Sequence, residues 1–540
     1  MRLTNDSLKD TAAWEKADIA LPRFDRAAMI AATEAAPGWV HFGAGNIFRA
    51  FLAALQQTLL DQGLEKTGVI VAAGYDGEII DTCFLPFDNL SLLVTLKADG
   101  SIGKQVIASI ASALRMDKAA DYEKLKHIFA SPGLRMASLT ITEKGYSIRG
   151  QDGVLLPAIA GDFRAGPAAS RSYLGRITAL CWERYTRGGL PLAMVSMDNC
   201  SHNGDRLFAA VEAFAAAWSE NGFTDNGFLE YVRDPSRLSF PWSMIDKITP
   251  RPDDSVRNML RSLGFEDTRI FVTGKNSYSA PFVNAEETQY LVIEDRFPNG
   301  RPALEKAGVL FTGRETVDKV EKMKVCTCLN PLHTALAVFG CLLGYTRISE
   351  EMKDGDLVRL IECIGYREGL PVVTDPGIIS PRQFLDQVIK QRFPNPFMPD
   401  TPQRIASDTS LKIPIRFGET LKAYRKSATL STGDLTGIPL VLAAWLRYLL
   451  GVDDQGRPFT VSPDPLYTML SSFLGSLRLG QSGPFHDILE PLLSDTALFG
   501  LNLYEAGLGE KVEAYFTEFM AGPGAVRAGL KSNLDRSVSV

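Results

Sequence analysis

The spacing of apolar positions along the chain changes near residue 300. Before that point, short apolar runs typical of buried strands alternate with helical patterns, and these runs cover 39–42, 69–73, 90–96, 136–142 and 192–196. Beyond it, apolar residues recur at helical spacing over 315–329, 332–343, 355–368, 380–391, 436–450, 464–478, 487–499 and 509–520. The pattern predicts the α/β fold class, with a doubly wound N-terminal sheet domain followed by a mainly α-helical C-terminal domain.

A chain of 540 residues is too long for one hydrophobic core, because single cores stop growing at roughly 250 to 300 residues. The stretch from Ile293 to Pro302 is dense in turn-forming residues and marks the boundary. We therefore expect a sheet domain over 37–300 and a helical domain over 301–540. Residues 1–36 combine short helical pieces with prolines, and are expected to be an N-terminal extension packed on the sheet domain.

Composition describes a soluble globular chain with 45% hydrophobic and 22% charged residues. No run reaches the roughly 20 apolar residues of a membrane-spanning helix, so no membrane role is expected. The first residues lack the apolar core of a signal peptide and the seven cysteines form no disulfide framework, which together indicate the cytoplasm. A net charge of −6 argues against nucleic acid as a partner, so a small anionic substrate would need a locally basic pocket. Monomer and dimer both remain open.

A glycine turn joins the first predicted strand to a helix. Gly43-Ala-Gly45 follows the strand 39–42, the helix covers 47–60, and the strand 69–73 completes a βαβ unit. In a Rossmann-type domain such glycines let the backbone approach a pyrophosphate that sits on the helix N-terminus. Phe48 replaces the third glycine of the usual motif, so a dinucleotide site and a plain tight turn remain equal alternatives.

Three charged residues near this unit each have two interpretations. Arg49 either adds positive charge toward a phosphate or is a solvated surface arginine. Asp76, and as second choice Glu78, follows the second strand, where a carboxylate accepts hydrogen bonds from the adenosine ribose and favours NAD over NADP. Because the spacing from the glycines is longer than usual, ordinary turn acids are an equal alternative.

Polar clusters follow the fourth and fifth predicted strands. Thr142 to Tyr146 forms one cluster, and Asp198 with Asn199 begins the other. Because ligands of doubly wound sheets bind outside the carboxyl ends of the strands, both clusters lie where a site is expected. Asp246, on a later extended segment, either faces this site or caps a turn.

The stretch from Glu321 to His333 carries groups suited to proton and oxygen chemistry. Lys324 stands among apolar residues, and a lysine acts as general base when burial favours its neutral form. Asn330, together with Asn199 from the sheet domain, can donate hydrogen bonds to an oxygen that becomes an alkoxide. His333 can orient a substrate hydroxyl.

Each of these residues also has a purely structural interpretation. Asn330 before Pro331 is a good helix N-cap, His333 suits a hydrogen-bonded core histidine, and a lone lysine is usually a surface residue. Cys326-x-Cys328 with His333 suggests zinc, but the cysteine spacing is too short and a fourth ligand is missing, so no metal is expected.

Several segments together resemble the polyol-specific long-chain dehydrogenases, the mannitol dehydrogenase family. The resemblance runs from about residue 38 to residue 450, in the same order. It implies an N-terminal Rossmann domain, a helical C-terminal domain and metal-independent hydride transfer with NAD(H). The segments are Gly43-Ala-Gly45-Asn-Ile-Phe-Arg49-Ala, Leu139-Thr-Ile-Thr-Glu-Lys-Gly-Tyr146, Asp198-Asn199-x3-Asn203-Gly204, Met244-Ile-Asp246-Lys-Ile-Thr-Pro250 and the cluster of Lys324, Asn330 and His333.

The resemblance assigns roles to residues of this chain. It implies that Lys324 is the general acid/base, and that Asn199 and Asn330 stabilise the oxyanion. It also implies that His333 orients the substrate and that Glu321 passes protons to solvent. Substrate contacts are expected from Arg404, Lys412 and Asp246, and cofactor contacts from Gly43, Gly45, Asn46, Phe48, Arg49, Asp76 and Glu143.

One departure from the family sets a geometrical condition. The family separates its lysine and asparagine by four residues, whereas five lie between Lys324 and Asn330. Six steps along a regular helix would leave the two side chains about 240° apart. Both can reach one oxygen only if the helix contains a π-bulge or a break before Pro331.

Positive charge gathers between Arg392 and Lys426. Seven basic and three acidic residues give this stretch a balance of +4 in a chain of −6. Such charge favours a carboxylate-bearing sugar over a neutral polyol, although a solvated basic face would give the same count. Within the family, Thr142 to Tyr146 and Val292 to Asp295, with Asn299 to Pro302, are most similar to the fructuronate reductases.

The resemblance therefore predicts reversible, NADH-dependent reduction of D-fructuronate to D-mannonate in hexuronate catabolism. Tagaturonate reductase and mannitol 2-dehydrogenase activities remain alternatives within the family. A non-catalytic NAD(H)-binding sensor is the alternative from a different class, because the shifted Lys324 would be misplaced on a regular helix.

Overall fold

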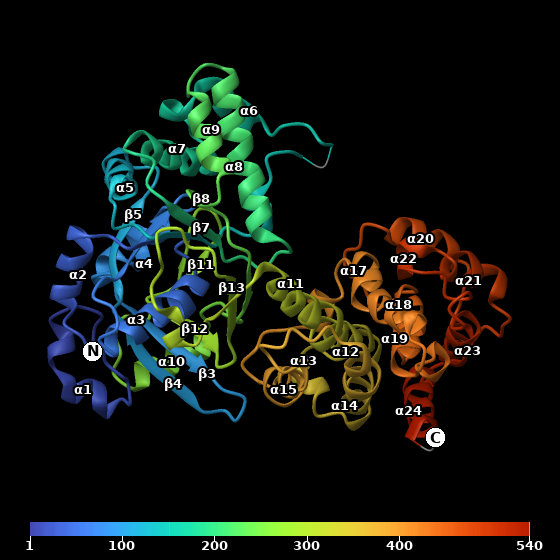
Figure 1. The fold of residues 1–540 in the computed structure, drawn as a ribbon. Coiled ribbons are helices and arrows are strands. Elements are labelled where there is room, and N and C mark those ends of the chain that lie inside the picture. Colours follow the sequence, from blue (N-terminus) through green and yellow to red (C-terminus); the bar gives the residue numbers. More distant parts are fainter. Residues whose placement is uncertain (151, 539–540) are drawn as a thin grey trace. The chain divides into compact units, whose positions relative to one another are not determined.

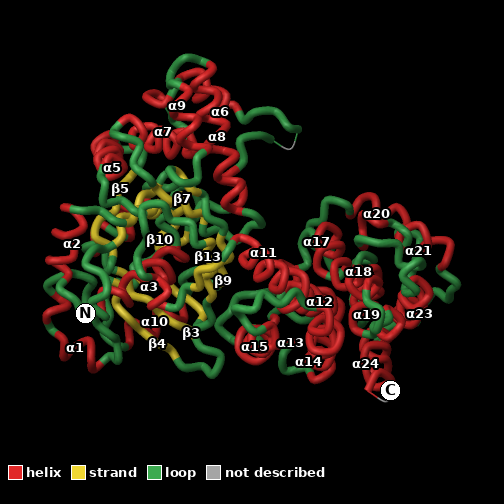
Figure 2. The backbone as a smooth tube through the Cα atoms, viewed as in Figure 1, coloured by secondary structure: helices red, strands yellow, loops and turns green. Residues whose placement is uncertain are grey.

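The structure is a computed structural model that describes residues 1–150 and 152–538. The chain forms two compact units (Figure 1). Met1–Lys97 and Ser101–Asp318 make the sheet unit, and Ala98–Gly100 with Lys319–Val540 makes the helical unit. The named strands all belong to the sheet unit (Figure 2). The chain passes from one unit to the other inside helix α11 (Arg314–Met323).

Six parallel strands form the main sheet of the sheet unit, in the order β5-β2-β1-β6-β7-β8. Numbered by their succession in the chain, the six strands stand in the order 3-2-1-4-5-6, which is the arrangement of doubly wound dinucleotide-binding sheets. The expected fold class is therefore confirmed. The strands are β1 (Trp39–Phe42), β2 (Val69–Ala73), β5 (Ile110–Arg115), β6 (Met136–Leu139), β7 (Leu192–Ser196) and β8 (Leu238–Ser239).

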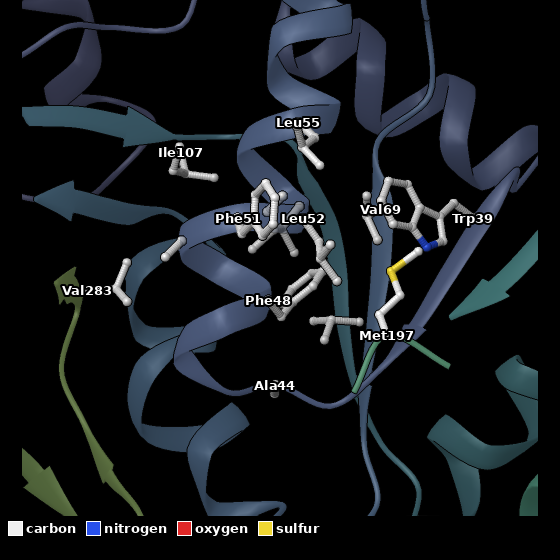
Figure 3. Packing of buried hydrophobic residues seen from close by; sticks show 14 of the residues in the cluster. Trp39, Ala44, Phe48, Phe51, Leu52, Leu55, Val69, Ile107, Met197 and Val283 are labelled. Carbon is white, nitrogen blue, oxygen red and sulfur yellow. The ribbon is translucent and has the colours of Figure 1, made fainter. Parts of the chain in front are cut away.

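The main sheet is buried on both faces, which explains why most of its strand residues are apolar. Successive residues alternate between two cores, as the pleat requires. Trp39 and Val69 belong to one core, which Figure 3 shows with the helical residues Phe48 and Leu52. Val40 belongs to the other. Helix α3 (Ala53–Asp61) contributes to the first core, and α5 (Ala119–Ala130), α7 (Tyr173–Thr186) and α8 (Asn203–Glu220) contribute to the second.

The strand predictions need two corrections. The third strand of the main sheet, β5, was missed because its polar and small residues weaken the apolar signal. The predicted strand 136–142 ends at Leu139, because Thr142 adopts a φ of +66° ahead of a 3-10 turn.

The predicted strand 90–96 exists as β3 (Ser91–Leu96), but it lies in a separate sheet, β12-β3-β4, with β4 (Ile102–Ile107) and β12 (Phe282–Glu286). A further sheet combines β9 (Ser243–Asp246), β13 (Tyr290–Glu294) and β14 (Leu310–Thr312).

The helical unit contains helices at each of the eight predicted positions. Three of them change into π-helical turns at their C-terminal ends, and the predicted helix 487–499 is interrupted at Ser494 and Asp495. The α-helices after α11 are α12 (Asn330–Leu343), α14 (Gly355–Glu362), α15 (Pro381–Gln387), α19 (Gly437–Tyr448), α20 (Tyr467–Leu474), α21 (His486–Leu493), α22 (Thr496–Phe499) and α23 (Gly509–Met520). Also present are α13 (Ile348–Glu351), α16 (Pro402–Ile405), α17 (Thr409–Arg416), α18 (Gly418–Lys426) and α24 (Ala525–Val538).

One helical run has the length and composition of a membrane span. It covers Arg314–Leu343, and 78% of its most apolar window is buried inside the fold. Such burial is the pattern of a core helix, because a core helix is apolar on every side that other helices cover.

The order of the main sheet reverses between β1 and β6, and Gly43 lies at this point. Its φ is +127°, and its amide donates to the carbonyl of Ala72 at 3.0 Å. A Cβ at Gly43 would stand 2.4 Å from the carbonyl oxygen of Thr140, which follows β6. At Gly45, in contrast, a Cβ would meet nothing within 4 Å. The fold itself therefore requires glycine at position 43, whereas packing within the protein does not require it at position 45.

Replacement of the two glycines is expected to separate their roles. Gly43→Ala should lower the free energy of unfolding by about 1–3 kcal/mol, because of its φ and the collision with Thr140. Gly45→Ala should change it by less than about 0.5 kcal/mol. Urea unfolding followed by circular dichroism measures both, and equal stability of the two variants would contradict the assignment.

Candidate active site

The crevice at the switch point between β1 and β6 is the place where doubly wound sheets bind a dinucleotide. The open space at Gly45 fits this function, since a missing Cβ lets a ligand approach the backbone. Helical structure begins directly after it, at Asn46, so the helix N-terminus offers backbone amides to a pyrophosphate. The residues present therefore fit a dinucleotide.

Two predicted cofactor residues have other positions than the sequence suggested. Arg49 is fully buried, and its guanidinium donates to the Ala280 carbonyl at 2.6 Å and to Asn46 Oδ1 and Ser279 Oγ at 2.9 Å. The interpretation as a solvated surface arginine is therefore wrong. Its charge is enclosed by protein and its guanidinium holds Asn46, while its part in cofactor binding stays a prediction.

Phe48 also faces the protein interior. Its ring stacks on that of His41, with centroids 4.5 Å apart and planes 6° from parallel. The backbone of Phe48–Leu52 is a π-helical turn that leads into α3. Because the aromatic ring fills the space against the sheet, any contact of Phe48 with a cofactor is expected from its backbone.

The loop between β10 (Phe271–Val272) and β11 (Tyr278–Ser279) forms hydrogen bonds with the acidic residues Asp76 and Glu78, which follow β2. Asp76 is buried and accepts a hydrogen bond from Thr273 Oγ1 at 2.6 Å, while the exposed Glu78 accepts one from the Gly274 amide at 2.9 Å. The loop lies almost two hundred residues away from these acids in sequence. No motif in the sequence marks Thr273 as a partner of Asp76. Whether Asp76 or Glu78 binds the ribose stays a prediction.

The ends of β6 and β7 are tied together by Asp198. Its carboxylate accepts hydrogen bonds from the amides of Ile141 (2.7 Å) and Thr142 (2.8 Å) and from the hydroxyl of Tyr146 (2.5 Å). Burial raises the pKa of Asp198. The amide of Asn203 donates to the Asp198 carbonyl at 2.9 Å. Asp198 is therefore a positioning residue for the loop that follows β6.

Three other predicted residues of the sheet unit lie at strand ends. Asn199 directly follows Asp198, and its side chain is exposed. Glu143 is exposed and forms an ion pair with Arg206 at 3.0 Å. Asp246 is the buried last residue of β9. Their roles in binding and catalysis stay predictions.

In the helical unit, the geometrical condition on Lys324 and Asn330 is met. Lys324–Cys328 forms a π-helical turn, in which the Leu329 amide donates to the Lys324 carbonyl at 3.1 Å. Leu329 leaves helical geometry with φ −129° and ψ −63°, and α12 begins at Asn330. The predicted interruption of the helix is confirmed.

The structural alternatives for Lys324 and Asn330 are wrong. Lys324 is only 3% exposed, so it is no surface lysine. The N-cap of α12 is Leu329, and no side chain caps this end; Asn330 is therefore inside the first turn and its amide does not act as a cap. Glu321 is half-buried on α11, one turn before Lys324.

His333 lies one turn into α12 in a positively charged surrounding. Within the described residues, its Nε2 atom is buried without a hydrogen-bond partner, and Asp400 Oδ2 stands 3.6 Å away. Burial lowers its pKa to about 3, with contributions from four cations. The interpretation as a hydrogen-bonded core histidine is therefore wrong, since this neutral imidazole still has hydrogen-bonding capacity to offer. The cations are Arg416, Arg404, Arg392 and Lys412.

The two predicted basic substrate residues differ in their environments. Arg404 is 62% exposed and paired with Asp400. Lys412 donates to the carbonyls of Ile405 (3.2 Å) and Ser407. Burial and the nearby charge of Arg416 lower the pKa of Lys412 to about 8.

Arg392 and Arg416 were counted in the basic stretch but not singled out as site residues. Arg392 is buried at the end of a π-helical turn, Val388–Arg392. Arg416, the last residue of α17, donates to Thr334 Oγ1 at 2.6 Å. Neither residue is distinguishable from a surface cation by sequence alone, because only the packing of the helices buries Arg392 and half-buries Arg416.

Comparison with known proteins agrees with this architecture. The model of the mannitol dehydrogenase Rossmann domain matches residues 37–306, and that of the mannitol dehydrogenase C-terminal domain matches residues 316–513. The chain is 51% identical to the D-mannonate oxidoreductase of Thermotoga maritima over 99% of both chains.

Two solved structures are similar over nearly the whole chain. D-sorbitol dehydrogenase in substrate-free form has a TM-score of 0.78 at 24% identity, covering 96% of this chain and 97% of its own. The ternary complex of Pseudomonas fluorescens mannitol 2-dehydrogenase with NAD and D-mannitol has a TM-score of 0.67 at 27% identity, covering 97% of both chains. The chain is thus an oxidoreductase and belongs to the mannitol dehydrogenase family.

Proposed function

We propose that this protein interconverts D-fructuronate and D-mannonate with NAD(H), by metal-independent hydride transfer with Lys324 as general acid/base. The observation that carries the proposal is the π-turn. It begins at the buried Lys324 and precedes α12, which carries Asn330 and the cation-surrounded His333. The identity to a D-mannonate oxidoreductase supports the substrate. The similarity to a dehydrogenase complex that contains NAD supports the cofactor.

The sheet unit supplies the residues that would hold the cofactor. The turn Gly43–Gly45 and the amides that begin at Asn46 suit the pyrophosphate, and Asp76 or Glu78 suits the adenosine ribose. A carboxylate at the ribose repels a 2′-phosphate, which favours NAD over NADP. Bound NADH would supply the hydride for reduction of the substrate carbonyl.

The helical unit supplies the proton chemistry. In reduction, the Lys324 ammonium gives a proton to the carbonyl oxygen, and in oxidation the neutral amine takes one from the hydroxyl. The Asn330 amide donates a hydrogen bond to the same oxygen as negative charge develops on it. Glu321 exchanges protons between Lys324 and solvent. Asn199 of the sheet unit is proposed as the second amide donor, on the basis of the family resemblance.

The local charge favours a sugar acid over a neutral polyol. Four cations act on His333, and such a field stabilises both a substrate carboxylate and a developing alkoxide. The neutral imidazole of His333 can then orient a hydroxyl without adding charge. The alternative of a non-catalytic sensor depended on a misplaced lysine, and the π-turn removes the reason for it.

Lys324→Ala is expected to lower kcat by about 10²- to 10⁴-fold, which is the usual contribution of a general acid/base. NADH binding should be retained, since Lys324 and the glycine turn belong to different units. Loss of NADH absorbance with D-fructuronate, D-tagaturonate and D-fructose measures turnover, and cofactor fluorescence measures binding. The control is Lys322→Ala, an exposed lysine of α11. Full activity of Lys324→Ala would remove Lys324 from the mechanism.

The preference for an acid substrate is expected to fall above about pH 8. Lys412 is charged below its pKa of about 8 and neutral above it, whereas His333, with a pKa of about 3, stays neutral over this range. The ratio of kcat/KM for D-fructuronate to kcat/KM for D-fructose should drop about tenfold as Lys412 loses its proton, because the positive field that attracts the carboxylate loses one charge. The ratio cancels any effect of pH on the steps that both substrates share.

The control for this pH dependence is Lys412→Met. Its ratio should be low at all pH values and should not change around pH 8. A ratio that stays constant in the unmodified protein, or that still falls in Lys412→Met, would show that another group is responsible.

A further inference from the structure

Arg416 lies against the helix face that carries Asn330 and His333. Its Nη1 group donates to Thr334 Oγ1 at 2.6 Å and to the Asn330 carbonyl at 3.5 Å. The Thr334 hydroxyl in turn donates to the same carbonyl at 3.0 Å. One edge of the guanidinium is thereby fixed on the first turn of α12, directly beside the proposed oxyanion donor.

Arg416 has no acidic partner among the residues that the structure describes. The neighbouring Arg404 is paired with Asp400, and Arg425 on α18 lies 4.0 Å from Glu505. Burial lowers the pKa of Arg416 to about 10, so the side chain remains charged at neutral pH. A cation removed from water without a counterion is costly. An anionic ligand would supply the missing counterion.

The N–H donors of Arg416 are also better placed to bind an anionic ligand than those of Lys412 and Arg404. The Lys412 ammonium is directed to two backbone carbonyls, and Arg404 is mostly exposed. The Nε and Nη2 groups of Arg416 donate to none of the described residues, so a planar pair of N–H groups remains for a ligand. This fork matches the geometry of a carboxylate.

We propose that Arg416 binds the carboxylate of the sugar acid and thereby makes the site select acids over neutral polyols. The inference rests on the proposed function and names a specificity-determining residue within it. Thr334 acts as a positioning residue, because its hydroxyl holds the guanidinium edge that faces away from the substrate.

Arg416→Gln tests the proposal. The variant should lower kcat/KM for D-fructuronate about 100-fold more than kcat/KM for D-fructose, since both substrates lose one positive charge near the developing alkoxide but only the acid loses its charge-assisted contact. Arg416→Lys keeps the charge without the fork and should lower the ratio of the two values by about tenfold. Arg425→Gln, an exposed arginine of α18, is the matched control and should retain the ratio of the unmodified protein.

Equal losses of kcat/KM for D-fructuronate and D-fructose in Arg416→Gln would overturn the proposal, because they would mean that Arg416 acts only through Thr334 and Asn330. An unchanged ratio in Arg416→Gln would overturn it as well. If circular dichroism shows that Arg416→Gln is unfolded, Arg416→Lys decides by the same ratio, and an unchanged ratio there overturns it. Calorimetric titration of D-mannonate and D-mannitol into the NAD-saturated protein gives the same comparison by binding. Unmodified protein that reduces D-fructose but neither reduces D-fructuronate nor oxidises D-mannonate would instead refute the proposed function.

Discussion

The π-turn at Lys324–Cys328 is the constraint on which the chemistry of the helical unit depends. A buried lysine and an irregular helical turn each cost free energy, and such features persist only where the surrounding structure imposes them. Thr420 of α18 donates to the Cys326 carbonyl at 3.2 Å. A Cβ at Gly369 would come within 2.7 Å of Thr327 Cγ2, so a second π-helical turn, Cys363–Gly369, packs closely against the first. The irregular turn is therefore held by its neighbours.

The cations around His333 add an electrostatic constraint to this geometry. They come from three segments, the π-turn Val388–Arg392, α16 and α17, and they act on one imidazole. Their field is felt more strongly in a site with little water than at a surface. Burial, together with this field, keeps His333 neutral, and the field favours anions. The same arrangement would hold a carboxylate substrate and stabilise an alkoxide.

In the sheet unit, buried polar side chains do the corresponding positioning. Asp198 holds the loop after β6, Arg49 holds Asn46 at the start of the helix, and Thr273 holds Asp76. None of these partners is near the other in sequence except Arg49 and Asn46. Each bond is made inside the protein, where an unsatisfied polar group would be costly. The loops at the switch point are therefore fixed before any ligand binds.

The sequence by itself determined the features that depend on local spacing. These are the apolar strands, the helices of the second unit, the glycine turn at Gly43–Gly45, and the condition that Lys324 and Asn330 cannot share a regular helix. Only the tertiary structure decided which polar groups meet. It buried Arg49 instead of exposing it, left Asn330 without a capping role, and placed Arg416 beside Thr334 without an acidic partner among the described residues. The periodicity of a chain reports which face of an element is buried, but the partner of a polar group is chosen by packing between elements that are distant in sequence.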